Sequence, residues 1–496
     1  MIDSILIDLQ QYKTVCKACD KILDAASDVD EVVSIPMLHV VREHPQCLKL
    51  YNFIFNEEKN FKSRSVNLLK KALGLTKSIL FDSKINNIPL NFDKDSRNLI
   101  IVSHITNPNQ CSNIDDEYFG SLHNNLLKFS NIRPIILLIN QTSVSSKQLS
   151  KDLSKNKIDR IVIPKSSGLL NELRILFRLL IAVYRFTRSK IFRDPVALSI
   201  LNVLSKPSIF LSGMSALRIG FFIEKIVKIS DSKYVFTTYE GHSRERIIFS
   251  SARKANKDIL CYAYQHTVLN KYQHSLTRNI HKKYNPDHIF CCGAITHSIL
   301  SSSNSLNGVE TSILGSPKAS LGDLQSKTID NNKNLTFLFL PEGIESEYQI
   351  FFKFILECAN VFPKSRFVWR SHPLLDLEKL DFFKEKILPA NITISKNKFD
   401  DDLKLPDIAV YRGTNAIIRA VMGNLIPIYL KTKAEISIDI MSVLELNRVL
   451  SISELQSIIH NPQLLVNKKE TVKFCQDYFR PMNYKSFLQV VDQNGF

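Results

Sequence analysis

The spacing of apolar residues changes along the chain and predicts two kinds of region. Over residues 1–95 the apolar positions recur at helical spacing, as at Ile2, Ile5, Leu6 and Leu9, and β-rich runs are absent. From residue 99 onward, short β-branched runs bounded by polar clusters alternate with longer helical patterns. This alternation is typical of βα units around a parallel sheet. The pattern therefore predicts a helical segment followed by an α/β protein.

Short apolar runs that read as buried strands fall into two series. The first series occupies residues 99–104, 135–140, 160–164, 234–239, 259–264 and 288–292, and the second occupies 335–340, 367–370, 392–394, 408–411 and 426–430. A polar stretch that includes Gly315, Ser316 and Pro317 separates them and marks a junction between residues 286 and 334. Each series alternates with helical patterns, such as that over residues 348–359.

These patterns predict the fold class α/β, with two Rossmann-like doubly wound lobes and a helical N-terminal segment. The predicted domains are a helical segment at 1–95, a first lobe at 96–290, a second lobe at 291–465 and a helical segment at 466–496. A length of 496 residues with 44% hydrophobic content supports the division, because it exceeds what one compact core usually holds.

The charge of the chain indicates an anionic partner. A formal net charge of +17 favours nucleic acid, an anionic membrane surface or an anionic small substrate. The sequence contains no RNP-like aromatic motif, zinc finger or Gly-Lys-Ser/Thr phosphate loop, so charge is the only support for nucleic acid. We therefore expect no nucleic-acid partner and regard a nucleic-acid-binding protein as the weaker alternative.

Cysteine usage and hydropathy indicate a cytoplasmic protein. The nine cysteines are scattered, and the N-terminus carries acids where a signal peptide would carry Lys or Arg. Cys16 and Cys19 form a CxxC pair, but no second pair follows at zinc spacing, so we expect no metal site. No apolar run reaches the length that spans a bilayer.

Candidate ligand-binding residues follow the strands of the second series, because open α/β sheets bind ligands beyond the carboxyl ends of their strands. Gly413, Thr414 and Asn415 lie between the strand at 408–411 and a helix start. The free backbone N–H groups there, with two side-chain donors, suit a phosphate. An ordinary capping turn has the same pattern.

Two further turns of the second lobe carry polar residues. Arg370, His372 and Pro373 follow the strand at 367–370, where a cation and an imidazole suit a phosphate leaving group, although strand-end histidines are as often structural. Glu342 and Gly343 follow the strand at 335–340. Glu342 can bind nucleotide hydroxyls while Gly343 lets the nucleotide approach the backbone, or the acids of this turn complement a helix dipole.

The first lobe offers candidates for a catalytic base. Glu240 and His242 close the strand at 234–239, and His266 closes the next strand. A carboxylate or imidazole there can take the proton of an acceptor hydroxyl. Alternatively, Glu240 caps the following helix or pairs with Arg244 one turn later.

Several short motifs together resemble a family of bacterial surface carbohydrate biosynthesis proteins with a GT-B-like fold. The matching motifs are Tyr118-Phe119-Gly120-Ser121-Leu122, Tyr239-Glu240 with Arg244-Glu245-Arg246, Tyr264-Gln265-His266, Leu314-Gly315-Ser316-Pro317, Arg370-Ser371-His372-Pro373 and Gly413-Thr414-Asn415-Ala416. The resemblance covers about residues 97–490. It implies a metal-independent glycosyltransferase that needs no cofactor beyond its nucleotide-sugar substrate and builds a surface polysaccharide on a glycan or lipid-linked acceptor.

The His-Pro pair is also similar to the element by which sialyl- and Kdo-transferases contact the phosphate of a CMP-sugar. That similarity implies that His372 binds the donor phosphate with help from Thr414 and Asn415, and that the donor is a CMP-linked nonulosonate or Kdo. The acidic-acidic-Gly pattern of some sialyltransferases is reduced here to Glu342-Gly343 after a proline. A non-catalytic GT-B-like assembly protein is the alternative.

Residues 174–193 combine apolar positions at helical spacing with basic residues. Such a basic amphipathic helix can lie in the interface of an anionic membrane, where a lipid-linked acceptor resides. This would make the protein peripheral at the inner face of the plasma membrane. In the alternative, the apolar stripe belongs to the core.

Overall fold

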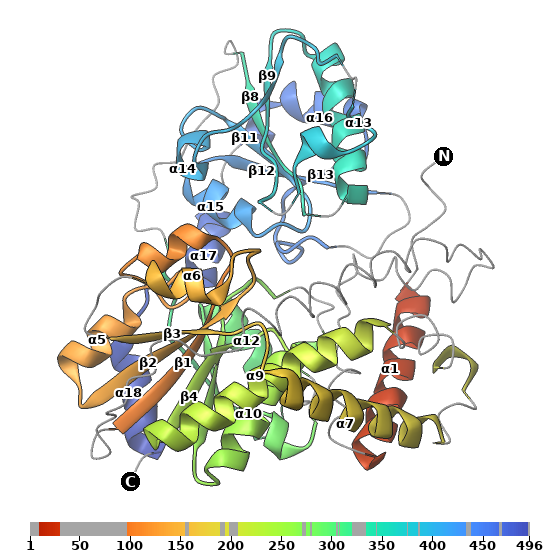
Figure 1. Ribbon diagram of the computed structural model, residues 1–496. Coiled ribbons are helices and arrows are strands. Elements are labelled where there is room, and N and C mark those ends of the chain that lie inside the picture. The colour runs from red at the N-terminus through yellow and green to blue at the C-terminus, as the bar shows by residue number, and fades with distance from the viewer. Residues whose placement is uncertain are drawn as a thin grey trace. The chain divides into compact units, whose positions relative to one another are not determined.

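The computed structural model divides into two compact units. It describes residues 9–29, 97–153, 158–188, 194–197, 207–269, 274–277, 280–303, 306, 308–319, 334–343, 345–373, 375–384, 387–432, 438–465 and 469–494. The first lobe consists of Leu9–His266, Tyr272–Pro317 and Arg480–Phe496, and the second lobe is built on Lys318–Phe479 together with Thr267–Lys271. Many of the elements named below are labelled in Figure 1.

The first lobe contains a parallel sheet with the order β3-β2-β1-β4-β5-β6-β7 in the described part of the chain. Its strands are β1 (Arg97–Ile105), β2 (Ile132–Asn140), β3 (Asp159–Ile163), β4 (Tyr234–Thr238), β5 (Leu260–Gln265), β6 (His288–Cys291) and β7 (Glu310–Ile313). The order reverses between β1 and β4, which is the switch point where doubly wound sheets bind ligands. β1 is buried along nearly its whole length, as its apolar run predicts for a central parallel strand.

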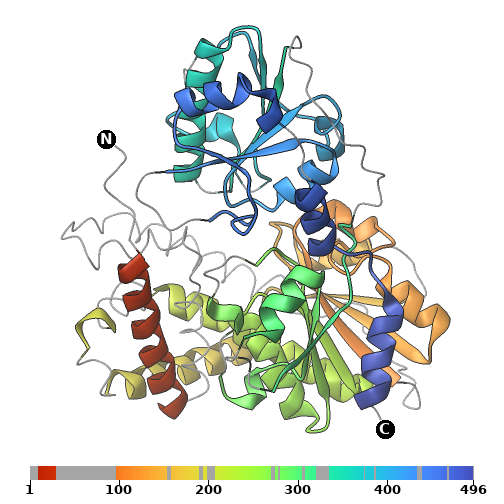
Figure 2. The same cartoon turned by 180° about the vertical axis from the view of Figure 1, so that it is seen from behind.

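Helices cover both faces of the first sheet, α10 on one face and α18 on the other (Figures 1 and 2). The helical elements of this lobe are α1 (Leu9–Val29), η2 (Pro108–Ser112), α5 (Leu122–Phe129), α6 (Ser146–Lys151), α7 (Leu169–Thr187), α9 (Pro207–Ser230), α10 (Ser243–Ala255), α11 (His274–Thr277), η4 (Lys282–Tyr284), α12 (Ala294–Ser301) and α18 (Tyr484–Asn494). Phe487 of α18 packs on Phe236 and Phe290, with ring centroids 5.0 and 5.1 Å apart. The last helix of the chain thus completes the core of the first lobe.

The second lobe contains a parallel sheet with the order β10-β9-β8-β11-β12-β13 among the described residues. Its strands are β8 (Thr336–Leu340), β9 (Arg366–Trp369), β10 (Ile392–Ile394), β11 (Ile408–Tyr411), β12 (Ile426–Leu430) and β13 (Asn447–Val449). Its helical elements are α13 (Glu345–Val361), η6 (Leu377–Lys379), α14 (Phe399–Asp402), α15 (Ala416–Met422), α16 (Ile452–Ile459), η7 (Pro462–Leu464) and α17 (Lys469–Tyr478). Aromatic side chains of β8, β9 and α13, among them Phe339, Phe351 and Trp369, form the centre of its core.

The predicted fold class is confirmed, because both sheets are parallel and doubly wound. Every predicted strand is present, while β7 and β13 were not predicted because these short edge strands lack a continuous apolar run. The predicted helical segment at 1–95 is described only over 9–29, where it is the helix α1, and the rest lies outside the described residues.

The structure divides the chain later than the predicted boundary at residues 290 and 291. β7 pairs with β6, so the first lobe continues to Pro317, within the predicted junction of 286–334. Within residues 469–494, the described part of the predicted C-terminal helical segment at 466–496, α17 belongs to the second lobe and α18 to the first. The reason is tertiary: each helix follows the lobe against which its apolar face packs.

Candidate functional site

Polar side chains gather at the carboxyl ends of β1, β4 and β5 in the first lobe. Val102 of β1 aligns with Thr237 of β4, and Thr238 aligns with Tyr264 of β5. The residues that follow these positions therefore leave the sheet at the same edge. They form what we term the first-lobe cluster: His104, Tyr118, Glu240, His242, Arg244 and His266.

A tight turn after β4 positions Glu240 and His242. Gly241 has φ of +79°, a conformation that favours glycine. The Glu245 carboxylate accepts hydrogen bonds from the backbone N–H groups of Glu240 (2.9 Å) and His242 (2.8 Å). Glu245 therefore serves the start of α10, and the alternative in which Glu240 caps that helix does not hold.

The Glu240 carboxylate instead forms a hydrogen bond with the His242 imidazole, with 2.7 Å between Oε2 and Nε2. His242 is buried and Glu240 is half-buried, with 25% of its side chain exposed. A carboxylate that is hydrogen-bonded to an imidazole stabilises the imidazolium formed when the ring takes up a proton. This pair is therefore chemically suited to accept a proton from a hydroxyl group.

His104 is a neutral member of the first-lobe cluster. The amide nitrogen of Gln141 donates to His104 Nδ1 (3.1 Å), so Nε2 carries the proton and donates to the Thr238 hydroxyl (3.1 Å). Burial, followed by the positive charge of Arg244, holds the pKa of His104 well below its ordinary value. His104 therefore stays uncharged near neutral pH.

Aromatic contacts join His104 and His266 through one tyrosine. The Tyr118 ring makes edge contacts with His104 (5.6 Å between centroids) and with His266 (5.0 Å). Burial, and then the charge of Glu240, raises the pKa of Tyr118 to about 12. Tyr118 therefore keeps its hydroxyl proton and can act as a hydrogen-bond donor.

Arg244 brings a cation to the first-lobe cluster. Its charge acts on the pKa values of His104 and Tyr118. The buried Nε of Arg244 has no hydrogen-bond partner within the described ranges. An arginine in such a position can bind an anionic group of a ligand.

A second cluster forms at the carboxyl ends of β8, β9 and β11 in the second lobe. Leu340 of β8 aligns with Tyr411 of β11, and Phe339 aligns with Trp369 of β9. The turns after these strands therefore leave the sheet at one edge. They carry the residues of the second-lobe cluster: Glu342, Gly343, Arg370, His372, Pro373, Gly413, Thr414 and Asn415.

The His372 imidazole lies directly over Gly343. A Cβ atom added at Gly343 would lie 2.4 Å from His372 Nδ1, so only glycine permits this approach. The His372 backbone N–H donates to the Tyr348 hydroxyl (2.5 Å), which donates in turn to the Leu375 carbonyl (2.7 Å). The turn that carries His372 is therefore anchored on α13, and burial lowers the pKa of His372.

Glu342 lies beside Gly343 at the end of β8. Burial, and then the charge of Glu347, raises its pKa to about 7, while a hydrogen bond from the Gly343 backbone N–H acts in the opposite direction. Such a group changes charge near neutral pH. It can accept a hydrogen bond from a sugar or ribose hydroxyl when ionised.

Arg370 points toward a structural partner. Its Nη1 binds the buried Asp402 carboxylate and donates to the Asn397 carbonyl (2.9 Å). The guanidinium also lies over the Phe399 ring at 5.1 Å. These contacts anchor the guanidinium to α14 and to the loop before it, and the predicted role of Arg370 as a phosphate ligand stays a prediction.

The turn after β11 is held by a buried ion pair. Arg412 Nε binds Glu347 of α13, and the two side chains are 0% and 2% exposed. Beyond it, the buried Thr414 hydroxyl accepts from the Ala416 backbone N–H (3.3 Å), while Asn415 is exposed at the start of α15. α15 begins at Ala416, as the predicted helix start requires.

The structure thus places Glu240, His242 and His266 at one sheet edge in the first lobe. It places the predicted donor ligands at one sheet edge in the second lobe, where His372 lies over Gly343 and Arg370 is paired with Asp402. His104, Tyr118 and Arg244 are members of the first-lobe cluster that were not predicted as site residues. His104 could have been predicted from its position at the carboxyl end of the first strand. Arg244 could have been predicted from its position in the first turn of the helix that follows β4.

The described residues offer neither a metal site nor a membrane-spanning helix. No group of three or more His, Cys, Asp or Glu side chains there could hold a metal ion. In the same part of the chain, every helix is too short or too polar to cross a membrane.

Comparisons with known proteins find distant structural likenesses. No protein-family model matches the chain, and a search of curated proteins finds no match. The kitacinnamycin glycotransferase aligns with 10% identity and a TM-score of 0.46, over 80% of this chain and 99% of its own. The glycosyltransferase SnogD from Streptomyces nogalater aligns with 9% identity and a TM-score of 0.43, over 81% of this chain and 100% of its own.

UDP-GlcNAc 2-epimerase from Neisseria meningitidis, bound to UDP-GlcNAc, aligns with 11% identity and a TM-score of 0.42, over 80% of this chain and 100% of its own. These values assign neither a family nor an activity to this chain.

Proposed function

We propose that this chain is a glycosyltransferase that moves a sugar from a nucleotide-sugar donor to a surface polysaccharide or lipid-linked acceptor. The observation that carries the proposal is the hydrogen-bonded pair of Glu240 and His242 beside the cation of Arg244. Sugar hydroxyls are poor nucleophiles while neutral, so a positioned base accelerates their attack by about 10²- to 10⁴-fold. The resemblance to sialyl- and Kdo-transferases favours a CMP-linked donor.

In the proposed reaction, the acceptor hydroxyl oxygen attacks the anomeric carbon of the donor sugar. Its proton passes to the pair of Glu240 and His242, and the bond between the anomeric carbon and the phosphate oxygen breaks. The nucleotide phosphate leaves with the electron pair of that bond. His372, Thr414 and Asn415 of the second lobe are the proposed ligands of that phosphate, and Glu342 is the proposed ligand of a donor hydroxyl.

The proposal is tested by separating donor binding from turnover. Purified protein is titrated calorimetrically with CMP-, UDP-, GDP- and dTDP-sugars, and released nucleotide is then measured with an acceptor present. Glu240→Gln keeps the shape of the side chain but removes its basicity, so turnover should fall by about 10²-fold or more while donor affinity is unchanged. Glu310→Gln, on the edge strand β7 with an exposed side chain, is the matched control.

Two results would contradict the proposal. Wild-type turnover in Glu240→Gln would mean that this carboxylate takes no part in proton transfer. Failure of every nucleotide sugar to bind would favour a non-catalytic assembly protein.

A further inference from the structure

A basic pocket lies between α7, α9 and α10 of the first lobe, and neither cluster described above contributes to it. Its volume is about 900 Å³. Seven basic side chains and one carboxylate line it within the described part of the chain: Arg174, Arg178, Lys225, Lys228, Arg253, Lys254, Lys283 and Glu224. The pocket therefore carries a concentrated positive charge.

The walls of the pocket are held by close packing. Glu172 of α7 forms a bidentate ion pair with Arg218 of α9, with distances of 2.6 and 2.8 Å. A Cβ atom added at Gly220 of α9 would lie 2.4 Å from the Ser251 hydroxyl oxygen of α10. The three helices are thus fixed against one another, and the pocket is preformed.

Internal partners account for only part of the positive charge. Glu224 forms ion pairs with Lys228 (2.7 Å) and Lys254 (2.8 Å), and Arg253 binds Asp287 (2.8 Å). Within the described ranges, neither Arg174 nor Lys225 has a carboxylate partner, and both side chains are exposed. The pocket therefore retains cations for an external anion.

An exposed apolar surface adjoins the basic pocket along α7. It is lined by Leu170, Leu173, Phe177 and Ile181, and it shares Arg174 and Arg178 with the pocket. Leu170, Phe177 and Ile181 are 72%, 62% and 51% exposed. Among the apolar positions of the stripe predicted over residues 174–193, Phe177, Leu180, Ile181 and Tyr184 are exposed and Leu176 is partly buried, while residues 189–193 lie outside the described ranges.

We propose that this pocket binds the phosphate head group of an anionic phospholipid in a membrane, while the apolar side chains of α7 enter the bilayer interface. The shared Arg174 and Arg178 place cations next to exposed apolar groups, and this is the chemistry of a lipid whose phosphate adjoins its acyl chains. A free phosphate or a nucleic acid would neutralise the cations and leave the apolar surface in water. The inference rests on the proposed function only in that a lipid-linked acceptor is reached at a membrane.

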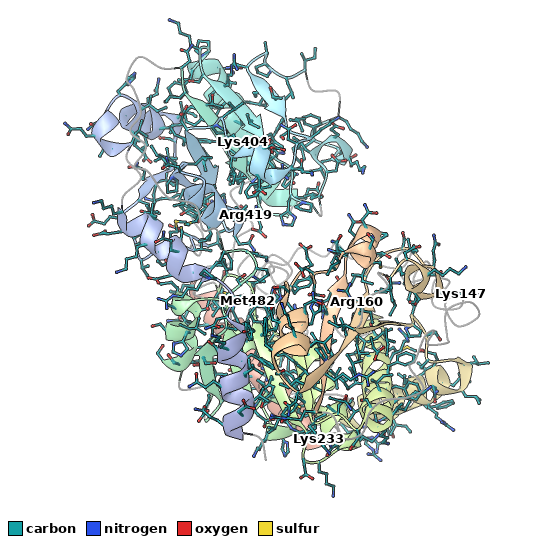
Figure 3. The ribbon with its side chains drawn as sticks, turned by 90° about the vertical axis from the view of Figure 1, so that its left-hand side faces the viewer. Lys147, Arg160, Lys233, Lys404, Arg419 and Met482 are labelled. Carbon is teal, nitrogen blue, oxygen red and sulfur yellow. The ribbon has the colours of Figure 1, made fainter. Side chains whose placement is uncertain are left out.

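The test is sedimentation of the full-length protein with vesicles of phosphatidylcholine alone or mixed with phosphatidylglycerol. Because each basic residue near an anionic surface contributes about 1 kcal/mol, the triple variant Arg174→Gln/Arg178→Gln/Lys225→Gln should bind mixed vesicles on the order of 100-fold more weakly. The variant Lys147→Gln/Lys151→Gln/Lys233→Gln removes the same amount of charge from exposed sites elsewhere on the lobe. Its affinity for mixed vesicles should fall far less. Lys147 and Lys233 lie at the periphery in Figure 3.

A second variant tests the apolar part of the site. Leu170→Ser/Phe177→Ser keeps every cation, and it should also weaken sedimentation with mixed vesicles because the acyl region is no longer contacted. Far-UV circular dichroism verifies folding of each variant. Vesicle binding is measured without sugar donor or acceptor, so its result is independent of whether the protein transfers a sugar.

Three outcomes would overturn the inference. Equal losses of vesicle binding in the two triple variants would indicate general charge attraction. Equal binding to both kinds of vesicle would exclude a preference for anionic phospholipid, because phosphatidylcholine carries a phosphate but no net charge. Salt-sensitive binding of an oligonucleotide that disappears in the pocket variant, with vesicle binding unchanged, would assign the pocket to nucleic acid.

Discussion

Replacing Glu342 with Gln should change how the stability of the second lobe depends on pH. The ordinary pKa of a glutamate is 4.5, and burial with the nearby charge of Glu347 raises the pKa of Glu342 to about 7. The folded state therefore holds this proton more tightly than the unfolded chain, and stability falls as pH rises from about 4.5 through about 7. Because a tenfold change in proton affinity corresponds to about 1.4 kcal/mol, ionised Glu342 lowers the free energy of unfolding by about 3 kcal/mol.

The single tryptophan of the chain makes this measurable. Trp369 is buried in β9 of the second lobe, so its fluorescence reports the unfolding of that lobe in urea. Glu342→Gln should match the wild type near pH 4 and exceed its stability near pH 8. Glu345→Gln, an exposed acid in the first turn of α13, is the control. Parallel pH profiles for the wild type and Glu342→Gln would refute the reasoning.

Two further substitutions test the second lobe. Gly343→Ala would place a Cβ 2.4 Å from His372 Nδ1 and displace the imidazole. Donor affinity measured by calorimetry should then fall by roughly tenfold, as expected for the loss of one hydrogen bond to a charged group. Unchanged affinity would exclude His372 as a donor ligand. Arg412→Met removes the arginine from the buried ion pair with Glu347 and should lower the free energy of unfolding by about 3–5 kcal/mol in the urea assay. A loss below about 1 kcal/mol would mean that water or another cation replaces the arginine.

The amino-acid sequence by itself determined most strands of the two lobes, although not the short edge strands β7 and β13. Strands such as β8, β11 and β12 read directly from their apolar runs, because a central parallel strand is buried on both faces and tolerates few polar residues. The strand-end positions of Glu240, His266 and His372 followed from the same runs, since a polar residue directly after a buried strand must lie at the edge of the sheet.

Only the tertiary structure decided which of these polar groups interact. Because of the turn at Gly241, Glu245 accepts the hydrogen bonds at the start of α10, and Glu240 pairs with the His242 imidazole. Residue spacing alone does not tell which of these two nearby acids has which role. The partner of Arg370 is Asp402, which is 32 residues away in the sequence.

Tertiary structure also decided where whole elements pack and which residues form the basic pocket. α18 completes the core of the first lobe through Phe487, although the whole second lobe precedes it in the chain. Arg174, Lys225 and Lys283 come from α7, α9 and η4 and meet only when these elements pack together with α10. Apolar periodicity depends on near neighbours in the chain and so specifies local structure, whereas ion pairs and pockets depend on contacts between distant segments, which form only when the chain folds.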